Sequence, residues 1–402
     1  MPFYCEPIEG TQFDKISDVE KWVVNEGRQL SRIPLAKLLD QGARFSDDEY
    51  FGDEYKFLKF NQHGIRALLQ PLGLRFETLN LVEQPGLVSD LLNDLIAQQE
   101  IRNRLEHSHF VVNGSSDTVL GAVSESYITY TNQEFLRDIR KVLEDGQQAN
   151  LFADSSDTLG RFRFVNGFSV NTQTYLRFTI TVKSGRVASY CGESEDISEV
   201  GIQFKNSMVG DSAVTIQYFV NRLICANGLI VPAGSSYSRV IHTGRRETFL
   251  GRLGKCFREV ECKIGAAGEA IKALMAIDFD PEALVRANMV EAIFEIIPGS
   301  RSEIMGAENI RKRPKQKMTE AGRIEHEASV IAGIPDHYAG EYSRRVFNSP
   351  YRSRATMFDF INIFTEYAQT QPIYKRLEIE EKTGLLADQI AKNRNEEGDV
   401  SN

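Results

Sequence analysis

The chain has 402 residues, of which 42% are hydrophobic and 26% are charged, and these ordinary globular values exclude a disordered, collagen-like or coiled-coil chain. Its formal net charge of −9 excludes a polycationic nucleic-acid coat, so any anionic partner must meet a local basic patch. The cysteines have no framework spacing, and no apolar run approaches the ~20 residues of a membrane helix. We therefore expect an intracellular protein with free thiols and no membrane contact.

Residues 1–150 are expected to form a mainly helical region with one β-hairpin. The helices are predicted from apolar residues at spacings of three and four, over residues 15–39, 63–72, 86–105 and 132–143. Two apolar runs, 109–112 and 119–130, flank a turn-rich segment and predict the hairpin.

Residues 151–277 are expected to form an antiparallel sheet with a crossing helix, because the apolar period changes to two from residue 160. Leu176 and Phe178 share one face of a strand that we predict to be half-buried. After the possible N-cap Asp211, an apolar stripe runs to Asn227-Gly228, which predicts a helix that crosses the sheet.

Residues 278–395 are expected to form a helical region with a basic loop at 301–317 and late helices over 355–369 and 373–392. The acidic tail, 396–402, is predicted to be disordered. The predicted fold class is therefore α+β, with a central antiparallel sheet and a crossing helix, flanked by N-terminal and C-terminal helical regions.

Three clusters of basic residues are candidate phosphate contacts. Residues 301–317 contain six basic against two acidic side chains, residues 239–255 contain five against one, and arginines of 344–354 form the third cluster. The residues that we expect to bind phosphates are Arg245, Arg246, Arg311, Lys312, Arg313, Lys315 and Lys317. The alternative interpretation is that these are solvated loops and helix faces, or contacts to the acidic surface of a neighbouring copy.

The polar face of the sheet is a second candidate surface. If Phe162 and Phe164 point into the core, the outer face presents a basic and aromatic platform suited to unpaired bases. Its members would be Arg161, Arg163, Tyr175 and Arg177. The alternative is an ordinary exposed sheet face.

A possible polar site gathers residues at the ends of predicted elements, namely Asn206, Ser207, Asp211, Asn227 and His242. His242 has an ordinary pKa suited to a general base or to a phosphate donor. Helix capping and turn formation explain the same residue types, so both interpretations stay open.

No motif of an enzyme active site or a cofactor site is complete in this sequence. The segment Gly251 to Cys256 resembles the end of a phosphate loop, but Phe249, two residues before it, stands where that loop needs its first Gly, and Cys256 stands where it needs Ser or Thr. The His and Cys residues lack the spacing of a metal site, and the sequence does not bring together the carboxylates that a metal-dependent nuclease needs. We therefore predict no catalytic residue, no metal and no cofactor, and leave open whether the protein is an enzyme.

Four stretches carry a resemblance to a known family: 120–132, which includes Ser124-Glu125-Ser126-Tyr127, then 200–229, 241–244 and 354–384. Together they resemble the phage/plasmid-like domain of unknown function, over roughly residues 50 to 390. The resemblance implies a mobile-element context in the cytoplasm of a bacterial host cell and brings no established reaction. A distant architectural likeness to ring-forming single-strand annealing proteins, which also pair a bent sheet with a crossing helix, transfers no activity.

These observations lead us to expect a phage- or plasmid-type protein that binds nucleic acid, in particular single-stranded DNA, as a homo-oligomer. One alternative is a non-enzymatic protein-interaction or assembly module in phage–host conflict. A less favoured alternative is a metal-dependent nuclease, or a hydrolase that uses His242.

Overall fold

The computed structural model describes residues 5–6, 10–27, 30–46, 51–52, 57–75, 85–145, 158–159, 162–170, 172–180, 198–222, 227–231, 238–259, 274, 276–279 and 356–399. Several predictions fall outside the described residues: Arg161, the basic segment with Arg311, Lys312, Arg313, Lys315 and Lys317, and the third basic cluster.

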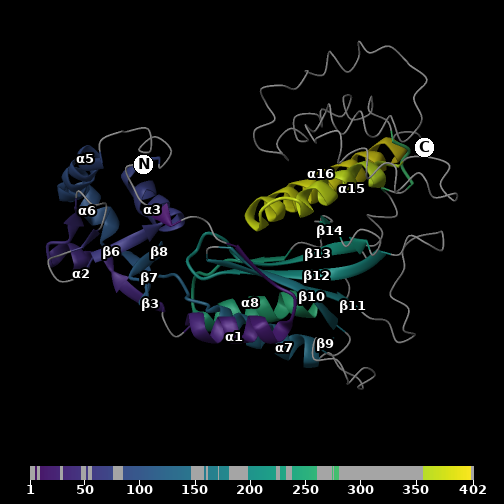
Figure 1. Cartoon of the computed structure of the whole chain (residues 1–402), viewed down its shortest axis with the longest axis horizontal. Coiled ribbons are helices and arrows are strands. Elements are labelled where there is room, and N and C mark those ends of the chain that lie inside the picture. The colour runs from purple at the N-terminus through teal and green to yellow at the C-terminus, as the bar shows by residue number, and fades with distance from the viewer. Residues whose placement is uncertain are drawn as a thin grey trace, which may run out of the picture.

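Two sheets with separate cores organise the chain (Figure 1). The N-terminal module has a seven-stranded sheet in the order β3-β7-β8-β6-β5-β4, with β1 paired to β6. Its strands are β1 Cys5–Glu6, β3 Leu30–Pro34, β4 Arg44–Phe45, β5 Phe51–Gly52, β6 Phe57–Asn61, β7 Ser108–Asn113 and β8 Thr118–Ser124. Its helices are α2 Leu35–Asp40, α3 Gln62–Leu69, the 3-10 turn η1 Gln70–Leu72, α5 Pro85–Ala97 and α6 Gln99–Leu105.

The second sheet is eight-stranded and antiparallel, in the order β14-β13-β12-β11-β10-β2, with β15 paired to β13 and β9 to β10. Its strands are β2 Gly10–Phe13, β9 Thr158–Leu159, β10 Phe162–Val170, β11 Gln173–Ile180, β12 Ser198–Ser207, β13 Val214–Arg222, β14 Asn227–Val231 and β15 Ser238–Val240. Helices cover both of its faces, as Figure 1 shows. Those on one face are α1 Ile16–Gly27, α7 Asn132–Asp145 and α8 Arg246–Arg258, and those on the other are α15 Met357–Gln369 and α16 Ile373–Asp399.

Strand pleating decides which side chains meet which helices. Leu176 and Phe178 of β11 pair with Phe204 and Ile202 of β12, and all four are buried on the face toward α1, α7 and α8. A register shift in β10 after Phe164 reverses the alternation of its side chains, so that Phe168 and Val170 face α16.

The predicted α+β class, with an antiparallel sheet and flanking helices, is confirmed. The hairpin β7–β8 and the helices α3, α7, α15 and α16 lie where the sequence placed them. The physical reason is local: Thr356 and Asp359, for example, form a capping box that fixes the start of α15.

The prediction of a helix that crosses the sheet is wrong, because residues 214–222 form strand β13. The same apolar residues satisfy a helical stripe and an alternating strand, and β13 pairs along its length with β12.

Three other expectations also differ from the structure. Strand β3 interrupts the helix expected over 15–39, the N-terminal region contains a full sheet beside its helices, and α16 continues through the tail to Asp399.

Candidate functional site

Helix α8 and the residue before it carry most of the described part of the second basic cluster, while Arg239 lies on β15. The buried residues Phe249 and Leu253 fix one side of the helix in the core. Arg245, Arg252 and Lys255 are exposed, and none makes an ion pair with a residue that the structure describes. These three side chains form what we call the α8 basic face, which can meet an anion without first breaking an ion pair.

Arg246 differs from these neighbours because it already has a carboxylate partner. Its guanidinium forms an ion pair with Glu134 of α7 and donates to the carbonyl of Thr129 at 3.3 Å. Glu134 also accepts from the backbone N–H of Thr131 at 3.0 Å, as part of a capping box at the start of α7. Arg246 therefore joins α8 to α7, and we do not retain it among the phosphate contacts.

The predicted platform on the sheet is wrong for two of its members. Phe162 and Phe164 do point into the core, and Arg163 is partly exposed, but Tyr175 and Arg177 are buried. Helix α16 covers this face: Leu377 packs against Tyr175, and the side chain of Arg177 is only 1% exposed. A nucleic acid cannot reach these two residues in this structure.

Arg177 instead belongs to a buried polar network between the sheet and α16. It donates to Gln203 at 2.6 Å and to Glu380, whose other carboxylate oxygen accepts from Arg376 at 3.0 Å. Both guanidinium groups lie 5.0 Å from the centre of the Phe168 ring. The network satisfies the Glu380 carboxylate and holds α16 on the sheet.

His242 is a buried structural residue in this arrangement. Its Nε2 lies 3.1 Å from Oδ1 of Asn206, whose amide group donates to the carbonyl of Tyr130. The rings of Tyr127 and Phe249 lie within 5.4 Å of the imidazole. Burial lowers the pKa of His242 to about 4, so the ring is neutral at neutral pH and has no open path to a substrate.

Asp211 lies at the junction of the second sheet with the N-terminal module, and its charge partly opposes the lowering of the His242 pKa by burial. It accepts from Thr172 at 2.9 Å and from Gln173 at 3.0 Å, and it lies 4.0 Å from Nδ1 of His63 on α3. Burial also lowers the pKa of His63, although the nearby carboxylate of Asp211 opposes this shift.

Among the side chains of the predicted polar site that the structure describes, Asn206 and His242 are brought into direct contact. The carbonyl of Ser207 accepts from the hydroxyl of Tyr127 at 3.1 Å, and Asn227 pairs with Arg222 in the β13–β14 ladder. Packing and hydrogen bonding account for these positions.

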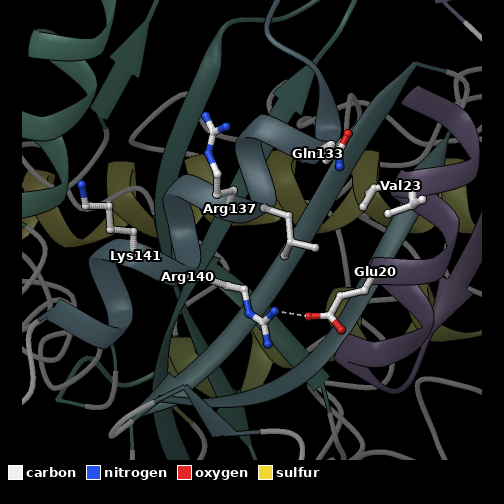
Figure 2. A pocket seen from close by; sticks show the side chains of 8 residues that line it. Glu20, Val23, Gln133, Arg137, Arg140 and Lys141 are labelled. Carbon is white, nitrogen blue, oxygen red and sulfur yellow. Dashed lines mark ion pairs between the residues drawn. The ribbon is translucent and has the colours of Figure 1, made fainter. Parts of the chain in front are cut away.

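Sequence reasoning missed a groove between α1 and α7, which has a volume of about 510 Å³ (Figure 2). Val23 and Leu136 form its apolar floor, and Arg137, Arg140 and Lys141 contribute its basic groups. The available signal was the spacing of these three cations on one predicted helix, at intervals of three and four residues.

Among the described residues, no three His, Cys, Asp or Glu side chains are grouped so that they could hold a metal ion. Within the same part of the chain, no helix has both the length and the apolar character needed to cross a membrane.

Comparison with known proteins gives one family. A family model described as "Domain of unknown function (DUF932)" matches residues 119–394. The matched span begins later than the residue 50 that the sequence resemblance suggested. No curated protein and no solved structure matches the chain.

Proposed function

The chain belongs to the DUF932 family, whose function is unknown, and from the geometry of α8 we propose that it binds single-stranded nucleic acid through phosphate contacts. The observation that carries the proposal is the α8 basic face, Arg245, Arg252 and Lys255, whose cations are exposed and have no described carboxylate partner. Such cations gain affinity by releasing the counterions of a phosphate backbone.

Two exposed apolar side chains favour single strands over duplexes. Ile241 and Leu250 are 52% and 39% exposed, and they occur in the same segment as the α8 basic face. Unpaired bases present apolar faces that such side chains can cover, whereas a duplex keeps those faces stacked. Because α8 is anchored in the core, the contacts are offered by a rigid element. The phage or plasmid context and the homo-oligomer belong to the same proposal.

The test removes the α8 basic face and measures binding of a labelled oligodeoxythymidylate by fluorescence anisotropy at several salt concentrations. We expect Arg245→Gln/Arg252→Gln/Lys255→Gln to weaken binding about 10- to 100-fold at low salt. The slope of log affinity against log salt should become shallower by about 2, since each single-strand phosphate contact contributes ~0.7.

The matched control removes the same charge elsewhere, with Lys37→Gln/Arg75→Gln/Lys375→Gln. These residues are also exposed and make no ion pair with any described residue, but they lie on α2, after η1 and on α16. The control should keep its affinity within about twofold, because exposed charges beyond a Debye length are screened. Equal losses in both variants, or wild-type binding that ignores salt, would contradict the proposal.

A further inference from the structure

The groove between α1 and α7 combines an apolar floor with a basic rim. Val23 and Leu136 are buried at its base, Val24 is partly exposed, and Gln133 offers an amide group at one end. Its volume of about 510 Å³ is in the range that takes a small organic group. An occupant therefore needs an apolar face together with a polar edge.

The charges at the rim favour an anionic occupant. Figure 2 shows Arg140 reaching across to Glu20 of α1, while Arg137 and Lys141 extend away from that ion pair. Lys141 pairs with no described carboxylate, and Arg137, whose side chain is 67% exposed, forms an ion pair with its partly buried neighbour Asp138 at 3.2 Å. An ion pair made by so exposed an arginine contributes little and can be replaced.

The groove is also close to the α8 basic face. The ion pair between Arg246 and Glu134 brings the start of α8 against the first turn of α7. Gln133, which lines the groove, directly precedes Glu134. A strand that contacts Arg245 at the start of α8 therefore passes near the groove.

We propose that the groove between α1 and α7 accepts one unstacked base of the bound strand, an inference that rests on the proposed function. The base lies with its face on Val24 and Leu136, and its polar edge meets the amide of Gln133. Arg137 and Lys141 contact the flanking phosphates. The groove thereby makes nucleobases, and not only phosphates, contribute to binding.

The test compares oligodeoxythymidylate with an abasic strand of equal length, which has the same phosphates and no bases. We expect the wild-type protein to bind the base-bearing strand about three- to tenfold more tightly. Val24→Gln makes part of the apolar lining of the groove polar without changing the charge. It should therefore lower this preference to the level that Ile241 and Leu250 alone support, and leave the affinity for the abasic strand unchanged. The matched control, Ala36→Gln on α2, should keep the full preference, because Ala36 is a partly buried helical residue outside the groove.

The outcomes separate the two proposals. If neither strand binds the wild-type protein, the proposed function fails. If both strands bind equally while the α8 triple variant still weakens them, the base site in the groove is overturned together with the base contacts of Ile241 and Leu250, and the phosphate contacts of α8 remain. Binding of a polyglutamate peptide that is lost in Arg137→Gln/Lys141→Gln, without any preference for bases, would also overturn it and identify a peptide groove.

Discussion

The two faces of the large sheet are held by different interactions. Toward α1, α7 and α8, the central strands present apolar side chains such as Phe178 and Phe204, whose rings lie 6.0 Å apart. Toward α16, the alternate positions on the same strands present Arg177 and Gln203, which bond to Glu380 and Gln217. The first face is stabilised by apolar burial, whereas the second combines a small apolar cluster of Phe168, Tyr175 and Leu377 with a polar network that must be satisfied as a whole.

This difference predicts how each face responds to substitution. Apolar burial is roughly proportional to area, so each truncation on that face adds to the last. The stability losses in a buried ion cluster do not add in this way. The loss of one member leaves a buried charge without compensation, whereas replacing every member with apolar residues leaves no buried charge. Neighbouring residues on β11 can therefore distinguish the two cases.

The largest effect is expected in the polar network. Arg177→Met should lower the free energy of unfolding by about 3–5 kcal/mol, because Glu380 then keeps a buried charge with fewer partners. Replacing the whole cluster, in Arg177→Met/Arg376→Met/Glu380→Leu, should recover most of that loss. Urea unfolding followed by circular dichroism measures both values.

Two controls sharpen this prediction. Arg102→Met breaks an exposed pair with Asp40 at 2.6 Å and should cost less than about 1 kcal/mol. On the apolar face, Phe178→Ala should cost about 3–5 kcal/mol, and adding Phe204→Ala should increase the loss. A triple variant less stable than Arg177→Met would show that the polar face behaves like the apolar one.

A smaller effect, of about 3 kcal/mol, is expected from protonation of His242 beside the apolar face. The folded pKa is about 4 and the unfolded pKa is about 6.5, so the unfolded state binds the proton first as the pH falls. The contribution of His242 to stability is therefore full above about pH 6.5 and is lost progressively down to about pH 4.

The measurement is the unfolding free energy of the wild type and of His242→Gln at about pH 7 and at pH 4. Gln can still donate to Asn206 but does not titrate, so the stability deficit of the variant should shrink as the pH falls. His63 has a shift in the same direction and contributes to both proteins equally. A deficit that stays constant with pH would contradict this assignment.

The smallest effect is expected at the exposed edge of the apolar face, where Glu134 caps α7 and pairs with Arg246. Glu134→Ala should cost about 1–2 kcal/mol through the lost cap and ion pair. Arg246→Ala should lower thermal stability slightly and weaken oligonucleotide binding less than Arg245→Ala does. If an anisotropy titration shows that Arg246→Ala weakens binding more than Arg245→Ala does, Arg246 is a phosphate contact after all.

Local signals explain which elements could be predicted from the sequence. Capping boxes at Thr131 and Thr356 mark the starts of α7 and α15, and a turn-rich segment marks the hairpin β7–β8. These signals depend on residues a few positions apart. The basic face of α8 was also visible, since Arg245, Arg252 and Lys255 are close in sequence and exposed.

The sequence by itself determined the α+β class and the positions of the locally capped elements, because near neighbours carry those preferences. Tertiary structure decided that residues 214–222 are a strand, since the pairing partner β12 fixes a segment that fits both patterns. It also decided that Arg177 is buried, because its partner Glu380 is 203 positions away in the chain. From the strand alone, an arginine is predicted to be exposed, because the spacing of residues within the strand does not indicate which helix covers it.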